Sequence, residues 1–128
     1  MPCPYVIVKE RRLVITTAEG RLTFAEAKAH QERLKNDPDF NPEFNQLLDT
    51  TAVTTLDIST EEAKIVAHGS LFFAPSSQRA WVAPTPHIFG MARFIQAHRE
   101  MAGAQDHFHV FYERDAALKW LGLSATQD

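Results

Sequence analysis

The chain has 128 residues, of which 45% are hydrophobic and 23% charged, and its formal net charge is -3. A chain of this length fits one domain, in which folding buries about two-thirds of the surface that the unfolded chain exposes. The net charge argues against nucleic-acid partners, because proteins that bind phosphate backbones gather Lys and Arg on one face. We therefore expect a single domain over residues 1–123, a polar tail at 124–128 and no nucleic-acid partner.

Cysteine usage and hydropathy indicate a cytoplasmic protein. Cys3 is the only cysteine, so no internal disulfide can form. No spacing of Cys and His matches a zinc motif. The first residues, MPCPYVIVKE, lack the basic leader and long apolar segment of a signal peptide, and no run of eighteen apolar residues occurs. We expect no metal, no cofactor and no membrane span.

The first third of the chain predicts a hairpin followed by a helix. Two short β-branched segments, at residues 5–8 and 13–17, flank the charged sequence KERR. A turn at Glu19-Gly20 then leads to a helix over residues 24–36, because Thr23 and Glu26 have the spacing of a capping box. This helix ends at Asp37-Pro38, since proline disfavours the helical conformation of the residue before it.

The remainder of the chain alternates strands with helices. The predicted strands span residues 46–49, 80–83 and 107–112. The predicted helices span residues 60–73, 86–103 and 114–121. A turn through residues 50–53 follows the first of these strands, and Thr85-Pro86 supplies the cap and first-turn proline of the middle helix.

The resulting order, β-β-α-β-α-β-α-β-α, is typical of an α/β domain. Strands that alternate with helices are joined by right-handed crossovers and lie parallel, whereas the initial hairpin is antiparallel. We expect a mixed sheet of about five strands carrying four helices.

One segment, LLDTTAVTTLDISTEEAKIVA at residues 47–67, together with this element order, resembles the STAS domains. These form the anti-sigma-factor-antagonist family typified by SpoIIAA, in which an Asp-Ser-Ser-Gly motif opens a helix and its first serine accepts phosphate from a partner kinase. Here Asp57-Ile58-Ser59-Thr60 falls at the place of that motif. Ile58 stands at the phosphoacceptor position and Thr60 replaces the glycine, so the residue that carries the family's switch is missing.

Two further segments, PHIFGMARF at residues 86–94 and DAALKWLG at 115–122, resemble the SpoIIAA-like branch of that family, whose members lack the motif. That branch is similar in outline to lipid-binding Sec14-type domains. The resemblance therefore implies a SpoIIAA/STAS-like fold and a bacterial regulator that binds an apolar ligand or a protein partner.

Ser59 has both a structural and a regulatory interpretation. Ser59 and Glu62 have the spacing of a second capping box, and acids in a first helical turn suit the helix dipole. Alternatively, Ser59 or Thr60 accepts phosphate at the helix N-terminus, although Asp57 and the adjoining glutamates would repel the added charge.

Three other residues are candidates for an anion or polar site. Asp49, at the carboxyl end of its predicted strand, lies where open α/β sheets bind ligands, although it could equally accept N–H bonds from the following turn. His87, just inside the predicted third helix, could bind an anion with Arg79 or Arg93 assisting. Together with Asp57 and Ser59, we take Asp49, His87 and Arg93 as the candidate polar site.

The six histidines raise a metal hypothesis. His107 and His109 are two residues apart in a predicted strand, so both face the same side and could share an ion. The alternative is a solvent-facing strand surface, with Phe108 and Val110 turned to the core. Because no third ligand is adjacent, we expect no metal site.

Large apolar side chains are numerous around the predicted second and third helices. They either fill the core, border an apolar pocket or pack in a homodimer, since Met and aromatic residues are enriched at interface centres. We take the following as the candidate ligand or partner surface: Leu71, Phe72, Phe73, Trp81, Ile88, Phe89, Met91 and Phe94.

The sequence thus predicts a non-enzymatic, STAS-like binding domain. Its partner is a protein, a second copy of the chain or a small apolar, lipid-like ligand near the second and third helices. One alternative is a phospho-regulated anti-sigma-factor antagonist. Another, from a different class, is a small hydrolase or isomerase that uses Asp49 and His87, which requires both side chains to converge in one cleft.

Overall fold

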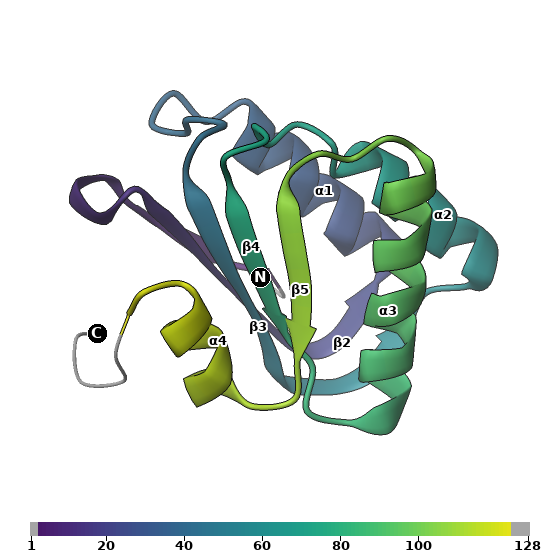
Figure 1. Ribbon diagram of the computed structural model, residues 1–128. Coiled ribbons are helices and arrows are strands. Elements are labelled where there is room, and N and C mark those ends of the chain that lie inside the picture. Colours follow the sequence, from purple (N-terminus) through teal and green to yellow (C-terminus); the bar gives the residue numbers. More distant parts are fainter. Residues whose placement is uncertain (1–2, 124–128) are drawn as a thin grey trace.

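The computed structural model describes residues 3–123 of the chain (Figure 1). The predicted tail at residues 124–128 lies outside them. The strands are β1 (Tyr5–Val8), β2 (Leu13–Thr23), β3 (Asn45–Asp57), β4 (Gln78–Val82) and β5 (His107–Phe111). The helices are α1 (Phe24–Lys35), α2 (Thr60–Gly69), α3 (Pro86–Met101) and α4 (Arg114–Trp120). The predicted fold class, α/β with a mixed sheet of five strands and four helices, is confirmed.

The sheet has the spatial order β1-β2-β3-β4-β5, antiparallel between β1 and β2 and parallel elsewhere. From β2 to β5, each strand lies next to the preceding strand, and the sheet grows in one direction. Right-handed crossovers then put all the connecting helices on one face. Figure 1 shows this arrangement, with α1, α2 and α3 on one face and α4 on the other.

The two central strands are longer than the sequence analysis predicts. The expected turn at Glu19-Gly20 is wrong, and so is the turn expected at residues 50–53. Both segments pair with each other in parallel, with Glu19 opposite Ala52 and Gly20 opposite Val53. Gly20 has a φ of 67° and accompanies shifts in register, so this glycine makes an irregularity within β2 and does not end the strand. Threonine and valine favour such a pleated conformation.

The second helix ends earlier than predicted, at Gly69 and not at residue 73. Ser70 is its C-cap, and the Ser70 hydroxyl donates to the carbonyl oxygen of Ala67 over 2.8 Å. The next aromatic residues leave the helix to pack on Phe40, whose ring centroid lies 5.6 Å from that of Phe72 and 5.1 Å from that of Phe73. Burial of these rings therefore outweighs continuation of the helix.

Both predicted capping boxes are confirmed. The Thr23 side chain accepts from the backbone N–H of Glu26, whose own side chain accepts from the Thr23 N–H. Ser59 and Glu62 form the same reciprocal pair at the start of α2. The charged KERR sequence also makes the hairpin connection, with a short 3-10 turn at Lys9–Arg11.

Side chains alternate between the two faces of the sheet. Leu47, Ala80 and Val82 pack with Leu118 beneath α4. On the other face, Trp81 belongs to the core cluster that includes Ile88 and Ile95 of α3, and Leu48 packs against this cluster. One short helix covers part of the α4 face, whereas the opposite face carries three helices.

Replacing Val53 with Ala tests the extension of β3. The Val53 side chain is buried in the core beneath the three helices. We therefore expect Val53→Ala to lower the free energy of unfolding by about 2 kcal/mol, measured by urea denaturation. The exposed neighbour Thr54 is the control, and Thr54→Ala should change that free energy by no more than about 0.5 kcal/mol. Equal losses in the two variants would contradict one-sided burial of this segment.

Candidate ligand-binding site

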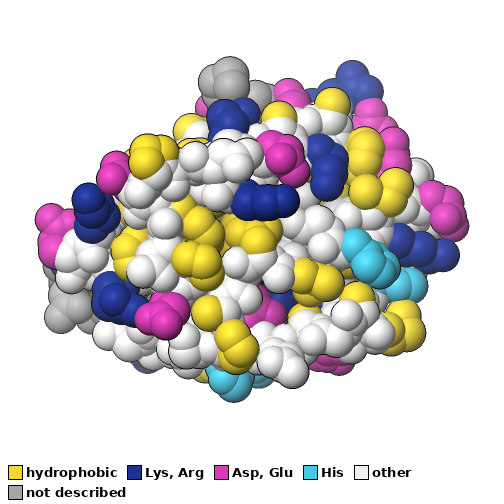
Figure 2. Space-filling model, turned by 90° about the horizontal axis from the view of Figure 1, so that it is seen from above, with side chains coloured by type: hydrophobic (Ala, Val, Ile, Leu, Met, Phe, Trp, Pro, Cys, Tyr) yellow, Lys and Arg dark blue, Asp and Glu magenta, His cyan; other side chains and the backbone are white. Residues whose placement is uncertain are grey.

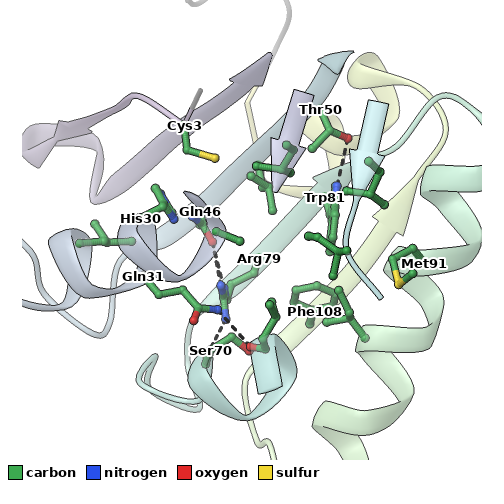
Figure 3. A pocket seen from close by; sticks show the side chains of 18 of the residues that line it. Cys3, His30, Gln31, Gln46, Thr50, Ser70, Arg79, Trp81, Met91 and Phe108 are labelled. Carbon is green, nitrogen blue, oxygen red and sulfur yellow. Dashed lines mark hydrogen bonds between the residues drawn. The ribbon is translucent and has the colours of Figure 1, made fainter. Parts of the chain in front are cut away.

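A cavity of about 80 Å³ lies between the sheet and the helices α1, α2 and α3 (Figure 3). A cavity needs only about 10–15 Å³ of such volume to hold one water molecule, so this one has room for several waters or a small organic group. Its walls come from the sheet and from all three helices, and most of them are apolar. They include Leu48, Leu56, Ile58, Val66, Phe72, Trp81, Met91, Ile95 and Phe108.

The apolar end of the cavity is built around Trp81 of β4. The indole Nε1 donates to the Thr50 hydroxyl over 3.1 Å, and that hydroxyl donates to the Val82 carbonyl oxygen over 2.6 Å. The polar atom of the indole is thereby satisfied within the protein. The ring is left as an apolar wall, edge-on to Phe108.

The polar end of the cavity is built around Arg79, also of β4. Its Nε and Nη2 both donate to Gln46 Oε1, over 3.1 and 2.9 Å. The Gln46 amide nitrogen donates to the Thr16 hydroxyl over 3.0 Å, and that hydroxyl lies 3.0 Å from His30 Nε2. A continuous polar chain thus crosses three strands and ends on α1.

A second buried arginine, Arg99 of α3, joins this network. Both guanidinium groups donate to the Ser70 carbonyl oxygen, over 2.9 and 3.0 Å, and both form ion pairs with Asp106. The side chains of Arg79, Arg99 and Asp106 are only 8%, 1% and 3% exposed. Arg79 also stacks over the Phe73 ring, 3.9 Å from its centroid. The polar end therefore buries two cations against one carboxylate.

Burial at this site shifts the pKa values of several groups. Burial, with a further contribution from the positive charge of Arg99, lowers the pKa of Arg79 to about 9, so the guanidinium stays charged at neutral pH. Burial lowers the pKa of His30 to about 4 and raises the pKa of Cys3 to about 11. Among the described residues that line the cavity, Arg79 is thus the one side chain that is charged at neutral pH.

The contact between α1 and α2 closes another side of the cavity. Gln31 of α1 donates from Nε2 to the Val66 carbonyl oxygen of α2 over 3.0 Å. A Cβ atom at Gly69 would lie 2.6 Å from Gln31 Oε1, so the absence of a side chain lets Gln31 pass beneath the end of α2.

The predicted apolar surface is divided by the structure. Phe72, Trp81 and Met91 line the cavity. Phe73 and Ile88 are buried in core clusters, and Leu71 is exposed. Phe89 stacks on Tyr112 with 3.8 Å between the ring centroids, and Phe94 packs against His98 with 4.5 Å between theirs. The candidate surface was predicted near the second and third helices, and that prediction did not include the wall that α1 supplies.

The predicted polar residues do not come together at one site. Asp49 accepts from the Thr51 N–H, as one interpretation proposed, and pairs with Arg114 of α4 over 3.3 Å. Asp57 forms an exposed ion pair with Arg21.

The remaining polar candidates lie on two different helices, Ser59 and His87 at helix N-termini and Arg93 in the middle of α3. Ser59 caps α2, whereas His87 and Arg93 are exposed on α3. Asp49 is paired on the α4 face of the sheet and α3 packs on the other, so Asp49 and His87 do not share a cleft.

The histidine pair of β5 lies on the molecular surface. His107 and His109 are exposed, while Phe108 and Val110 pack against the core as predicted. The ring of His109 lies 4.7 Å from that of Trp120. In residues 3–123, no group of three His, Cys, Asp or Glu side chains is placed to hold a metal ion. Within the same residues, none of the helices combines the length and the apolar character that crossing a membrane requires.

The residues that make the polar end were largely missed by sequence reasoning. Arg79 was considered only as a helper of His87, and Gln46, Arg99 and Asp106 were not considered. One signal was present: Arg79 directly precedes the apolar run AWVA, and a cation so close to a buried strand is unusual unless it is paired.

Comparisons with known proteins do not identify a family. No protein-family model matches the chain, and no curated protein matches it. The resemblance to STAS domains stays a prediction.

His30 should make stability depend on pH. The imidazole is neutral in the folded protein down to a pKa of about 4, whereas the unfolded chain protonates it near the ordinary value of 6.5. Stability is therefore lost as the pH falls from 6.5 toward 4, because only the unfolded state gains a proton. Between pH 7.5 and 5, we expect wild type to lose about 2 kcal/mol more than His30→Gln. Urea denaturation at both pH values measures this, and an equal loss in the two proteins would contradict it.

Ser59 should behave as a helix cap. Ser59→Ala removes the acceptor for the Glu62 N–H and should lower the free energy of unfolding by about 1 kcal/mol. Ser59→Asn is the matched control, because asparagine caps helices as well as serine does, and it should retain nearly all of that free energy. Thermal and urea denaturation of the three proteins would test this, and equal destabilisation by both substitutions would argue against a capping role.

Proposed function

We propose that this domain is a non-enzymatic binding domain whose ligand is a small apolar molecule, held in the cavity between the sheet and α1, α2 and α3. The observation that carries the proposal is the cavity itself. It combines a mostly apolar wall with one charged side chain, which is the usual composition of a small-molecule site. A cytoplasmic location and a STAS-like regulatory role belong to the same proposal.

The energetic cost of the cavity supports a ligand. Protein interiors are close-packed, and an unfilled cavity destabilises by about 24 cal/mol per Å³. For about 80 Å³ this corresponds to at most roughly 2 kcal/mol, because the cavity is partly open. Leu48 is only half-buried although β3 is the middle strand of the sheet. The helices thus leave part of the sheet open to a ligand.

Ile58 connects this site with the predicted family. By the STAS resemblance, Ile58 occupies the position of the phosphoacceptor. Its side chain is half-buried and lines the cavity. An apolar residue at this place suits a ligand-binding site better than a phosphorylation switch.

The surface supports a small ligand more than a large apolar partner interface. The exposed large hydrophobic residues of the described chain come from separate elements: Val6, Ile65, Leu71, Met101 and Tyr112. On the face shown in Figure 2, hydrophobic side chains reach the surface in small groups among charges of both signs. Extended protein interfaces usually have a continuous apolar centre.

Filling the cavity tests this function. Ala27 of α1 lines the cavity, so Ala27→Leu places extra methyl groups where a ligand would lie. We expect the variant to weaken binding of the neutral probe 1-hexanol by about tenfold or more. Trp81 lines the cavity and Trp120 lies in α4 on the other face, so Trp81 fluorescence in a Trp120→Phe background reports the binding.

The matched control for this experiment lies on the same helix. Ala29 is exposed, and Ala29→Leu should bind 1-hexanol as the Trp120→Phe background does. Equal affinities for Ala27→Leu and Ala29→Leu, or no binding by the background protein, would count against the cavity as the site. Native mass spectrometry of freshly purified protein would show in addition whether a small molecule copurifies.

A further inference from the structure

The polar end of the cavity carries an imbalance of charge. We propose that the ligand is a small carboxylic acid whose carboxylate binds at Arg79 and whose apolar part lies against Trp81, Met91 and Ile58. This inference rests on the proposed function and adds the chemical class of the ligand.

The positive charges at the polar end outnumber the negative ones. Arg79 and Arg99 bring two positive charges, and Asp106 pairs with both. The carbonyl end of α2 adds only about half a negative charge, through the Ser70 oxygen that both guanidinium groups share. His30 is neutral at neutral pH because burial lowers its pKa to about 4. The cluster therefore keeps a net positive charge where water is largely excluded.

The two guanidinium groups have more N–H donors than the protein supplies acceptors. Gln46 Oε1 accepts two bonds from Arg79, and the Ser70 carbonyl oxygen accepts one from each arginine. Among the described residues, Arg99 Nε is buried without any acceptor. Each guanidinium has five N–H donors, whereas a carboxylate offers two oxygens with about four acceptor sites. Arg79 makes four of its five possible donations within the protein and lines the cavity, whereas Arg99 does not, so a ligand carboxylate would accept from the remaining Nη2 N–H of Arg79.

Polar and apolar side chains lie at different ends of the cavity. Figure 3 shows Arg79 with Gln46, Gln31 and Ser70 on one side of the cavity and Met91 on the other. Phe108 also reaches the arginine, with its ring centroid 5.5 Å from the Arg79 guanidinium carbon. No aspartate or glutamate is among the described residues that line it. The site thus has a cationic end and an apolar end. This arrangement favours an anionic amphiphile and disfavours a cationic one.

The size of the cavity limits the apolar part. A cavity of about 80 Å³ is smaller than the roughly 150 Å³ that encloses a benzene molecule in an engineered core. The cavity is partly open, so an unbranched chain can extend out of it, and the half-buried Met91 and Phe72 are placed to adjust around that chain. A short-chain carboxylate therefore suits the site better than a bulky ring system.

Three probes that differ in the polar head group test the assignment. Hexanoate, 1-hexanol and hexylammonium each have six carbons in an unbranched chain, and their dissociation constants follow from Trp81 fluorescence in the Trp120→Phe background. We expect hexanoate to bind at least about tenfold more tightly than 1-hexanol, and hexylammonium to bind most weakly. Equal binding of hexanoate and 1-hexanol would overturn the carboxylate assignment while the cavity function stands. If none of the three binds, the proposed function fails as well.

A charge placed inside the network provides the second test. Gln46→Glu has nearly the same shape and gives Arg79 a carboxylate of its own, so we expect hexanoate affinity to fall by about tenfold or more. Binding of 1-hexanol, which carries no charge, should fall several-fold less than binding of hexanoate. Asn41→Asp adds the same charge in an exposed loop and should change neither affinity. Unchanged hexanoate binding in Gln46→Glu, or an equal loss for both probes, would show that Arg79 does not select the anion.

Discussion

The buried pairing of Arg79 and Arg99 with Asp106 is the interaction on which the rest of this structure depends. It joins β4, α3 and the segment before β5, and through the Ser70 carbonyl oxygen it holds the end of α2. Buried charges are tolerated only when they are paired and hydrogen-bonded. The rings of Phe73 and Phe108 beneath the guanidinium groups add cation–π stabilisation. Because one cluster anchors several elements, removal of either partner would leave a buried charge and disturb the cavity wall.

The topology explains why the apolar cavity lies beneath α1, α2 and α3. Strands added in a single direction place three crossover helices side by side, and α2 contacts both α1 and α3. The strip of β3 that begins at Leu48 runs beneath them toward Leu56, and both residues line the cavity. On the opposite face, α4 packs directly on Leu47, Ala80 and Val82. The mostly apolar cavity therefore belongs to the layer with three helices, whereas the pocket on the α4 face is partly lined by the charged side chains of Glu10, Arg11 and Arg114.

Local signals in the sequence were sufficient for the element order and the helix starts. Thr23 with Glu26, Ser59 with Glu62 and Thr85 before Pro86 each mark a helix N-terminus that the structure has. Strand lengths depend on pairing between distant residues. Gly20 is typical of a turn, yet β3 holds it in the sheet. The cluster was inaccessible for the same reason, since Arg79 and Asp106 are 27 residues apart and Arg79 and Gln46 are 33 apart. No periodicity relates such positions.

The acidic and hydroxyl side chains of residues 49–62, DTTAVTTLDISTEE, have different roles in the fold. Asp49 forms an ion pair with Arg114 and accepts a hydrogen bond from the Thr51 N–H. The Thr50 hydroxyl accepts from the Trp81 indole N–H, and Ser59 caps α2. The apolar residues within the same stretch, Leu56 and Ile58, face the cavity. A ligand that binds only the folded state stabilises it in proportion to the logarithm of ligand concentration over Kd. An anion at Arg79 would do so by relieving the net positive charge of the cluster that anchors α2 and α3. Occupancy of the proposed site would thereby be coupled to the stability of the helices that surround it.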